Sequence, residues 1–234
     1  MPDVALVGVQ DSDAGIVKKR AAESGNPPTF TDYHQMLAET RPDFVLALGR
    51  HRQMARIAHD LLDRGLPFLM EKPMGISADE VQSVADKVVK LKAYVAVPLF
   101  QRYQPFAARA RQLQAEGRFG PISHIYVRIN RPAPARYPAW DSAWMLDPAE
   151  AGGGCLRNLG PHGLDMFLYL TGEEAQVTGA RSVAGRTGSS SRTTPPCCCA
   201  RAAGSSAPSR SATASRAWAR TASGRSRAAT PSSP

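Results

Sequence analysis

Short apolar runs alternate with amphipathic segments along the first part of the chain. The apolar runs predict buried strands at residues 4–9, 43–48, 67–70 and 94–97. The segments between them predict helices at residues 13–24, 32–40 and 53–64. A further helix is expected to begin after Ser77, because Ser77 and Glu80 have the spacing of a capping box and valines follow at helical spacing. Strands and helices in this rhythm predict a parallel sheet with covering helices.

The pattern changes after Pro98. A helix is expected at residues 104–116, and residues 122–129 alternate between apolar and polar side chains. Such alternation is typical of a half-buried strand in an antiparallel or mixed sheet. A loop rich in Pro, Trp and Ala covers residues 131–151, and a largely apolar helix is expected at residues 160–170. The pattern therefore predicts a second α/β segment after the parallel sheet.

The chain from Arg181 onward has a different composition. It holds nine Arg but no Asp, Glu or Lys, and from Ala184 on it has no Val, Leu, Ile, Met, Phe or Tyr. Such a segment does not bury enough apolar surface to offset its ordering entropy, so residues 181–234 are expected to be disordered. Two interpretations remain, a natural basic tail and an out-of-frame translation. We favour the second, because GC-rich codons that are read out of frame yield mainly Ala, Arg, Pro, Ser, Thr and Gly.

The net charge of +9 belongs entirely to this tail, because residues 1–180 hold 20 basic and 20 acidic side chains. A neutral body argues against nucleic acid as a partner, and a basic-tailed nucleic-acid binder is the weakest alternative. Cys155 is alone in the body and residues 197–199 are three adjacent cysteines, a spacing that fits neither a disulfide framework nor a metal site. The body is therefore expected to be cytoplasmic and without metal. No apolar run has the length of a membrane span, so no membrane partner is expected.

Three motifs stand at predicted strand ends or near a predicted helix. They are Leu-Met-Glu-Lys-Pro at 69–73, Phe-Gln-Arg-Tyr-Gln-Pro at 100–105, and Gly-Gly-Gly-Cys-Leu-Arg-Asn-Leu-Gly-Pro-His-Gly-Leu-Asp at 152–165. In this order and spacing the motifs resemble the Gfo/Idh/MocA family of oxidoreductases. The resemblance covers residues 3–180.

The resemblance implies an α/β fold with an incomplete Rossmann-type parallel sheet, a partial second α/β domain with a mixed sheet, and a disordered tail. The dinucleotide-binding domain would cover residues 1–98, the substrate-binding domain residues 99–180, and the tail residues 181–234. The family's first strand and glycine-rich loop are expected to be missing, because no G-x-G-x-x-G occurs in the sequence. Family oligomers form across the sheet of the second domain. Most of that sheet is expected after residue 180, so we expect a homo-oligomer interface of this kind to be lost.

The resemblance also implies hydride transfer between a nicotinamide cofactor and a carbinol carbon of a sugar, inositol or related polyol. Oxidation of an alcohol requires a base that takes the hydroxyl proton as the hydride leaves the carbon. Imidazole ordinarily titrates near neutral pH, so His162 fits this role. Lys72 follows a predicted parallel strand, at the edge where ligands bind in open α/β sheets. We therefore expect Lys72 and His162 to be catalytic and to share one pocket.

Three further residues are expected to bind the substrate: Asn158, Asp165 and Arg102. Family members commonly carry Asp at the position of Asn158. An amide forms hydrogen bonds with substrate hydroxyls but does not share a proton at neutral pH. His162 and Lys72 would then have to act as the base. This departure favours the main alternative, a non-catalytic relative that binds a dinucleotide or a sugar. Trp140 and Trp144 are equally consistent with a sugar site and with packing of the loop on the core.

The expected cofactor is NAD or NADP. Its binding residues, by resemblance, are Asp11, Leu48, Gly49, Arg50, Glu71 and Lys72. Asp11 follows the first predicted strand, where the family's acidic residue holds the adenine ribose hydroxyls, and this favours NAD. Ser12 is neutral, which leaves NADP open.

Overall fold

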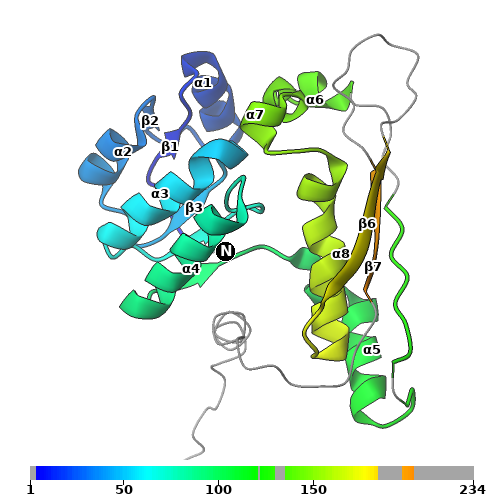
Figure 1. Ribbon diagram of the computed structural model, residues 1–234. Coiled ribbons are helices and arrows are strands. Elements are labelled where there is room, and N and C mark those ends of the chain that lie inside the picture. The colour runs from blue at the N-terminus through cyan, green and yellow to red at the C-terminus, as the bar shows by residue number, and fades with distance from the viewer. Residues whose placement is uncertain (1–3, 121, 130–134, 184–196, 203–234) are drawn as a thin grey trace, which may run out of the picture. The chain divides into compact units, whose positions relative to one another are not determined.

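The computed structural model describes residues 4–120, 122–129, 135–183 and 197–202 (Figure 1). The chain divides into two compact units, one up to Val45 and the other from Leu46 onward. Parallel strands alternate with helices up to residue 96, so the α/β class expected from the sequence is confirmed. Among the described residues, no helix combines the length and the apolar character that a membrane crossing requires.

The first unit is a two-stranded parallel sheet with two helices. Its elements are β1 (Val9–Gln10), α1 (Ala14–Glu23), β2 (Thr29–Phe30) and α2 (Tyr33–Thr40). Each helix begins after an aspartate, because the carboxylates of Asp13 and Asp32 accept hydrogen bonds from backbone N–H groups of the first helical turn. Both helices contact both strands, and they enclose Val17, Ala21, Phe30 and Leu37.

The buried strand expected at residues 4–9 is wrong in its extent. Strand β1 covers only Val9–Gln10, and the side chains of Val4, Leu6 and Val7 are 71%, 51% and 43% exposed. An apolar run becomes a buried strand only where neighbouring elements cover it, and among the described residues of this unit β1 pairs with β2 alone. Strand β2 was not expected, because a two-residue strand is too short to give a periodic pattern.

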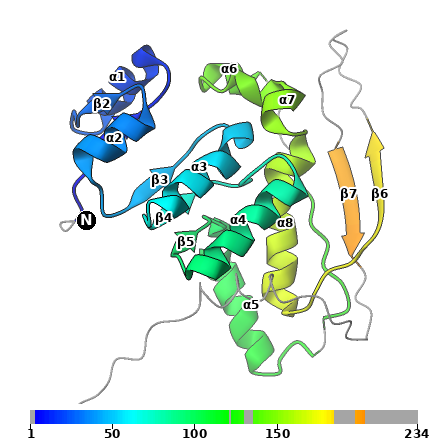
Figure 2. The same ribbon diagram turned by 60° about the vertical axis from the view of Figure 1, so that its left-hand side comes forward.

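The second unit begins inside β3 and contains a three-stranded sheet of order β3-β4-β5 (Figure 2). The elements are β3 (Val45–Ala47), α3 (His51–Asp63), β4 (Phe68–Met70), α4 (Ala78–Leu91) and β5 (Val95–Ala96). Helices α3 and α4 pack against each other, and β4 pairs with β5 in parallel. The largest side chains of this core that are less than 2% exposed are Met54, Leu61, Phe68, Met70 and Val84.

Helix α4 begins as its sequence predicts. The hydroxyl of Ser77 accepts a hydrogen bond from the backbone N–H of Glu80, and the Glu80 carboxylate accepts one from the N–H of Ile76. Strand β3, in contrast, is less buried than its apolar sequence suggests, because Leu46 is 62% exposed and Leu48 is 69% exposed. Strand β3 is at the edge of the described sheet, so its apolar run has a strand neighbour on one side only.

The chain after β5 is mainly helical. Its elements are η1 (Phe100–Tyr103), α5 (Pro105–Ala115), α6 (Arg136–Ala139), η2 (Ala143–Leu146), α7 (Pro148–Ala151), α8 (Cys155–Thr171), β6 (Val177–Val183) and β7 (Cys197–Ala202). Helix α8 contacts η1, α5 and β7. It starts five residues before the predicted helix at 160–170, because Gly160 and Pro161 hide the helical pattern of its first turns.

The structure differs from two expectations in this region. Residues 122–129 form no strand, because they pair with no described strand; Val127 instead lies against α8, where a Cβ on Gly163 would be 3.1 Å from the Val127 side chain. Composition predicts no strand after residue 180, yet β7 pairs with β6 in antiparallel fashion, since ladder hydrogen bonds need only the backbone. The rest of the tail, residues 184–196 and 203–234, lies outside the described residues.

Candidate active site around Lys72 and helix α8

Lys72 lies just beyond the carboxyl end of β4. The backbone N–H of Glu71 donates to the Ala47 carbonyl at 3.0 Å, so the end of β4 is tied to the end of β3. The N–H of Lys72 donates to the Glu71 carboxylate at 2.9 Å, and the Lys72–Pro73 peptide bond is cis. Lys72 and Glu71 are therefore held at the strand edge where ligands bind in open α/β sheets.

The ammonium of Lys72 binds helix α8. Its Nζ donates to the backbone oxygen of Asn158 at 2.7 Å and to the side-chain Oδ1 of Asn158 at 2.8 Å. His162 is four residues further along α8, one helical turn away, so Asn158 and His162 share one face of the helix. The structure thus brings Lys72 to the helix face that carries His162.

His162 is largely enclosed. Its ring is 7% exposed and meets the ring of Phe100 edge-on, with centroids 5.2 Å apart. Phe100 belongs to η1, the second of the three sequence motifs, so that motif packs directly on the third. Burial of a histidine against an aromatic ring fixes the orientation of the imidazole, which proton transfer to a defined atom requires.

The glycine run before α8 permits a close backbone approach. Gly152 has a φ of +70°, and a Cβ placed on it would be 2.6 Å from the Cβ of Ile76. Ile76 is four residues after Lys72, so the glycine run packs directly on the segment that follows the Glu-Lys-Pro motif. No residue with a side chain fits at position 152 without displacing that segment.

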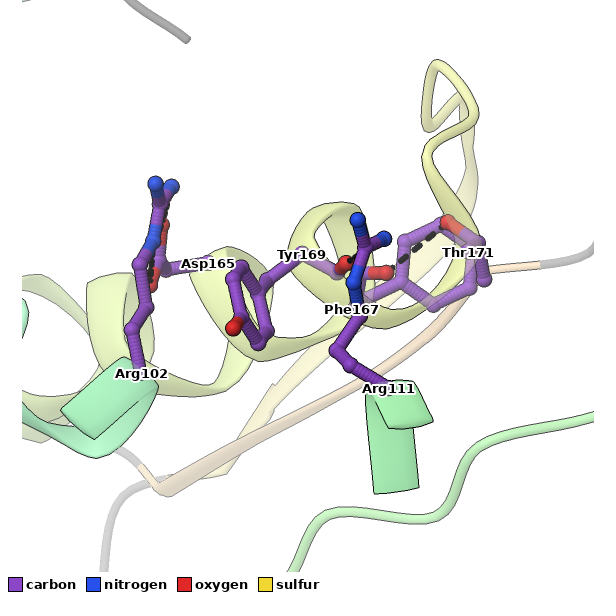
Figure 3. Close-up of polar contacts among 6 residues, drawn as sticks. All are labelled: Arg102, Arg111, Asp165, Phe167, Tyr169 and Thr171. Atoms are coloured by element: carbon purple, nitrogen blue, oxygen red, sulfur yellow. Dashed lines mark hydrogen bonds and ion pairs between the residues drawn. The ribbon is translucent and has the colours of Figure 1, made fainter. Parts of the chain in front are cut away.

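Arg102 and Asp165, both expected to bind substrate, bind each other (Figure 3). The Nε of Arg102 donates to both carboxylate oxygens of Asp165, at 3.0 and 2.9 Å, and Nη2 of Arg102 also donates to Asp165. Asp165 is 6% exposed, and its hydrogen bonds raise the pKa of the Arg102 guanidinium. The pair joins η1 to α8 at a position three residues after His162.

Two arginines lie close to the ring of Tyr169, which belongs to helix α8. The guanidinium carbons of Arg102 and Arg111 lie 5.4 and 5.2 Å from its centroid, and Arg111 Nη1 also donates to the Tyr169 carbonyl at 2.9 Å (Figure 3). These contacts fasten α5 and η1 to the second half of α8. They support the helix that presents Asn158 and His162.

Tyr137 belongs to this site, although nothing in the sequence pointed to it beyond the aromatic content of its loop. The amide Nδ2 of Asn158 donates to the Tyr137 hydroxyl at 3.2 Å, and Nη2 of Arg136 donates to the same oxygen at 2.8 Å. The Arg136 guanidinium also lies 4.4 Å from the centroid of the Tyr137 ring. The hydrogen-bonded chain from Lys72 therefore extends through Asn158 to α6.

His51 is a second residue of this site that was not predicted from the sequence. It is 6% exposed at the start of α3, its Nδ1 lies 2.9 Å from the Ala151 carbonyl, and its ring meets Trp144 edge-on at 4.9 Å. Burial lowers the pKa of His51, and the nearby positive charges of Lys72 and Arg157 lower it further. A neutral ring donates from Nδ1 to that carbonyl. Because its ring contacts the buried His51, Trp144 packs on the protein, whereas Trp140 is 62% exposed.

The lowered pKa of His51 gives a prediction for stability against pH. Protonation of His51 favours the unfolded chain, so its stabilising contribution is complete above the unfolded pKa and is lost as pH falls through the folded pKa. Urea unfolding of the wild type should lose up to about 1.4 kcal/mol per pH unit below about pH 6.5 from this group. The His51→Gln variant should lose less over the same range, and exposed His34→Gln should follow the wild type. Equal slopes for all three proteins would contradict the buried neutral state of His51.

The residues expected to bind the cofactor fall into both units. In the second unit, Leu48, Gly49 and Arg50 follow β3, beside Glu71 and Lys72 at the end of β4. Gly49 lies close against α3, since a Cβ there would be 3.3 Å from Ile57 and Met54. Asp11 belongs to the first unit, where one of its carboxylate oxygens accepts the Asp13 N–H at 2.9 Å. In the second unit these residues thus follow the carboxyl ends of β3 and β4, and a G-x-G-x-x-G turn for the pyrophosphate is not among the residues of this sequence.

Comparisons with known proteins agree with this arrangement. Residues 1–99 match the oxidoreductase family with an NAD-binding Rossmann fold, and residues 107–223 match the GFO/IDH/MocA C-terminal domain. The rhizopine catabolism protein MocA of Rhizobium meliloti is 31% identical over 62% of this chain and 43% of its own length. D-glucoside 3-dehydrogenase of Escherichia coli K12 is 28% identical over 73% of this chain and 47% of its own length. The chain thus spans about half the length of these curated relatives.

A solved structure shows the same fold. The WlbA dehydrogenase of Bordetella pertussis, in complex with NADH and UDP-GlcNAcA, has a TM-score of 0.68 at 20% identity, over 76% of this chain and 52% of that one. The two family matches, which between them cover most of the sequence, decide the assignment. This chain is a member of the Gfo/Idh/MocA family of NAD-binding oxidoreductases.

Proposed function

We propose that this chain carries the substrate side of a dehydrogenase that transfers hydride between nicotinamide and a carbinol carbon of a sugar, inositol or related polyol. The observation that supports the proposal most strongly is the contact of Lys72 Nζ with Asn158 at 2.7 and 2.8 Å, one helical turn from His162. An imidazole that can take up a proton and a cation that can donate a hydrogen bond to the same oxygen are together suited to moving a hydroxyl proton.

In the proposed reaction His162 takes the proton of the substrate hydroxyl, and Lys72 donates a hydrogen bond to the same oxygen. Asn158 holds the Lys72 ammonium and contacts a substrate hydroxyl through its amide. Arg102 and Asp165 were predicted as substrate contacts. Their bidentate pairing favours a role in holding η1 against α8, and a direct contact of either with substrate stays a prediction.

The proposed cofactor is NAD or NADP, and the nicotinamide ring accepts the hydride when the cofactor is bound. Asp11 would hold the adenine ribose, Leu48, Gly49 and Arg50 the next part of the dinucleotide, and Glu71 and Lys72 the nicotinamide end. A carboxylate at the end of β1 favours NAD. We also propose that residues 1–98 form the dinucleotide-binding part and residues 99–180 the substrate-binding part.

A non-catalytic relative that binds a dinucleotide or a sugar is the second candidate function. It is favoured by Asn158, since an amide does not take up the proton that the family's usual aspartate shares. It is also favoured by the lack of a G-x-G-x-x-G turn in this sequence. The two candidates differ in turnover, because only the dehydrogenase reduces the cofactor.

The test titrates the full chain with NADH by fluorescence and then measures reduction of NAD and NADP with myo-inositol, D-glucose and D-xylose. The proposed dehydrogenase binds NADH and reduces the cofactor with at least one polyol. The non-catalytic candidate binds NADH and reduces neither cofactor. Lack of NADH binding would overturn the dehydrogenase and the dinucleotide-binding form of the second candidate, and binding of a polyol without NADH would leave only its sugar-binding form. Asp11→Asn should weaken NADH binding, whereas Asp79→Asn at the exposed start of α4 should not.

A further inference from the structure

The amide of Asn158 connects Lys72 to Tyr137, and this connection has a fixed direction. A lysine ammonium has hydrogens to donate and no lone pair to accept with, so the amide oxygen of Asn158 must face Lys72 Nζ. The NH₂ group of the same amide then faces Tyr137 and donates to its hydroxyl oxygen at 3.2 Å. The orientation of the amide is thus set by chemistry and does not depend on telling nitrogen from oxygen.

The Tyr137 hydroxyl oxygen accepts from two groups that have only donors to offer it. One is the Asn158 NH₂ at 3.2 Å, and the other is Nη2 of Arg136 at 2.8 Å. A phenolic oxygen accepts two hydrogen bonds and donates one. Its own hydrogen must therefore point away from both partners. Within the described part of the chain, this hydroxyl takes part in these two hydrogen bonds and is the acceptor in both.

We propose that Tyr137 is a substrate-binding residue whose hydroxyl donates its hydrogen to a hydroxyl or ring oxygen of the bound polyol. The proposal rests on the proposed function and adds to it a contact and the reason for that contact. A carboxylate at position 158 would only accept, so Tyr137 would donate to it and present no hydrogen to a ligand. Asparagine reverses the polarity of the pair and releases the tyrosine hydrogen for the substrate.

The surroundings of Tyr137 suit a polyol. The Arg136 guanidinium carbon lies 4.4 Å from the centroid of the Tyr137 ring and 6.0 Å from that of the Trp140 ring. Trp140 is 62% exposed, so an exposed aromatic side chain lies near the guanidinium that donates to the Tyr137 hydroxyl. A sugar or cyclitol ring presents C–H groups on its faces and oxygens at its edge, which matches an exposed aromatic face beside a hydrogen-bond donor.

The first part of the test needs no ligand. The intensity ratio of the tyrosine doublet in Raman spectra reports whether the phenol accepts or donates, and subtraction of the Tyr137→Phe spectrum isolates Tyr137. We expect an acceptor in the wild type. In the Asn158→Asp background, the difference against the Asn158→Asp/Tyr137→Phe double variant should shift toward the donor state, because the phenol then donates to the carboxylate while it still accepts from Arg136. The same state in both backgrounds would overturn the proposal. Circular dichroism checks that each variant is folded, and exposed Tyr126→Phe is the matched control.

The second part measures binding of myo-inositol, D-glucose and D-xylose to the NADH-loaded full chain by calorimetry. Tyr137→Phe should weaken polyol binding about three- to tenfold, the effect of one hydrogen bond, and leave NADH affinity unchanged. In the Asn158→Asp background the same change should alter polyol affinity less than about twofold. Unchanged polyol affinity in Tyr137→Phe would overturn this inference alone. Absence of polyol binding in the wild type would overturn the proposed function and this contact together, whatever the Raman spectra report.

Discussion

Replacement of Lys72 by methionine is expected to lower kcat/KM for polyol oxidation about 10²- to 10⁴-fold, the usual contribution of a positioned proton-transfer group. Methionine keeps the length of the side chain and removes the donor that reaches both oxygens of Asn158, at 2.7 and 2.8 Å. The loss should fall mainly on kcat, because the lysine acts on the oxygen whose charge changes during the reaction. Initial rates of cofactor reduction, measured across substrate concentrations, separate the two parameters.

The matched control is Lys90→Met, at an exposed position of α4 remote from the contacts of Lys72. It should leave kcat/KM unchanged, and both variants should bind NADH. His162→Gln is expected to fall in the same range as Lys72→Met, since a glutamine keeps the hydrogen-bonding shape and does not titrate. A Lys72→Met protein with wild-type kcat would show that Lys72 only supports the fold, and the proposed proton transfer would be wrong.

The Arg102–Asp165 pair should produce the largest change in stability. Removal of the guanidinium in Arg102→Met leaves the Asp165 carboxylate, 6% exposed, without the partner that donates to both of its oxygens. Breaking a buried pair on one side costs about 3–5 kcal/mol. The Arg102 side chain is itself 26% exposed, so the lower end, about 3 kcal/mol, is expected in urea unfolding.

Two variants check the cause of that loss. Arg111→Met removes the neighbouring arginine of Figure 3, which is exposed and donates to a backbone carbonyl, and should cost less than about 1 kcal/mol. The double variant Arg102→Met/Asp165→Leu removes the buried charge together with its partner and should recover most of the lost free energy of unfolding. A double variant as unstable as Arg102→Met would mean that the loss comes from packing and not from an unpaired carboxylate.

The parts of the fold that the sequence predicts well are those in which one short segment decides its own structure. Helix α4 is set by Ser77 and Glu80, three residues apart, and α3 by an apolar face that repeats along its length. Residues 122–129 have an equally regular pattern and form no strand, because a strand also needs a pairing partner that its own sequence does not specify. Strand β7 shows the converse, a ladder formed by a segment without strand-like apolar residues.

The residues of the candidate site also fall into those that a local sequence pattern predicts and those that it does not. Lys72 and His162 are found from the sequence because each stands in a motif at a strand end or helix turn. Tyr137 and His51 are not, because their roles depend on how the 136–151 segment approaches α8 and α3. That approach depends on the Gly152–Ile76 contact, where backbone meets a side chain far away in the sequence. Local patterns carry no information about such a contact.

The proposed reaction moves hydride from a carbinol carbon to nicotinamide. The most direct measurement incubates the full chain with NAD and myo-inositol that is deuterated at its ring carbons, and examines the reduced cofactor by proton NMR. Direct hydride transfer predicts deuterium at C4 of the nicotinamide ring with the wild type and a greatly reduced yield with Lys72→Met. Reduced cofactor without deuterium at C4, or equal deuterium transfer by both proteins, would contradict it.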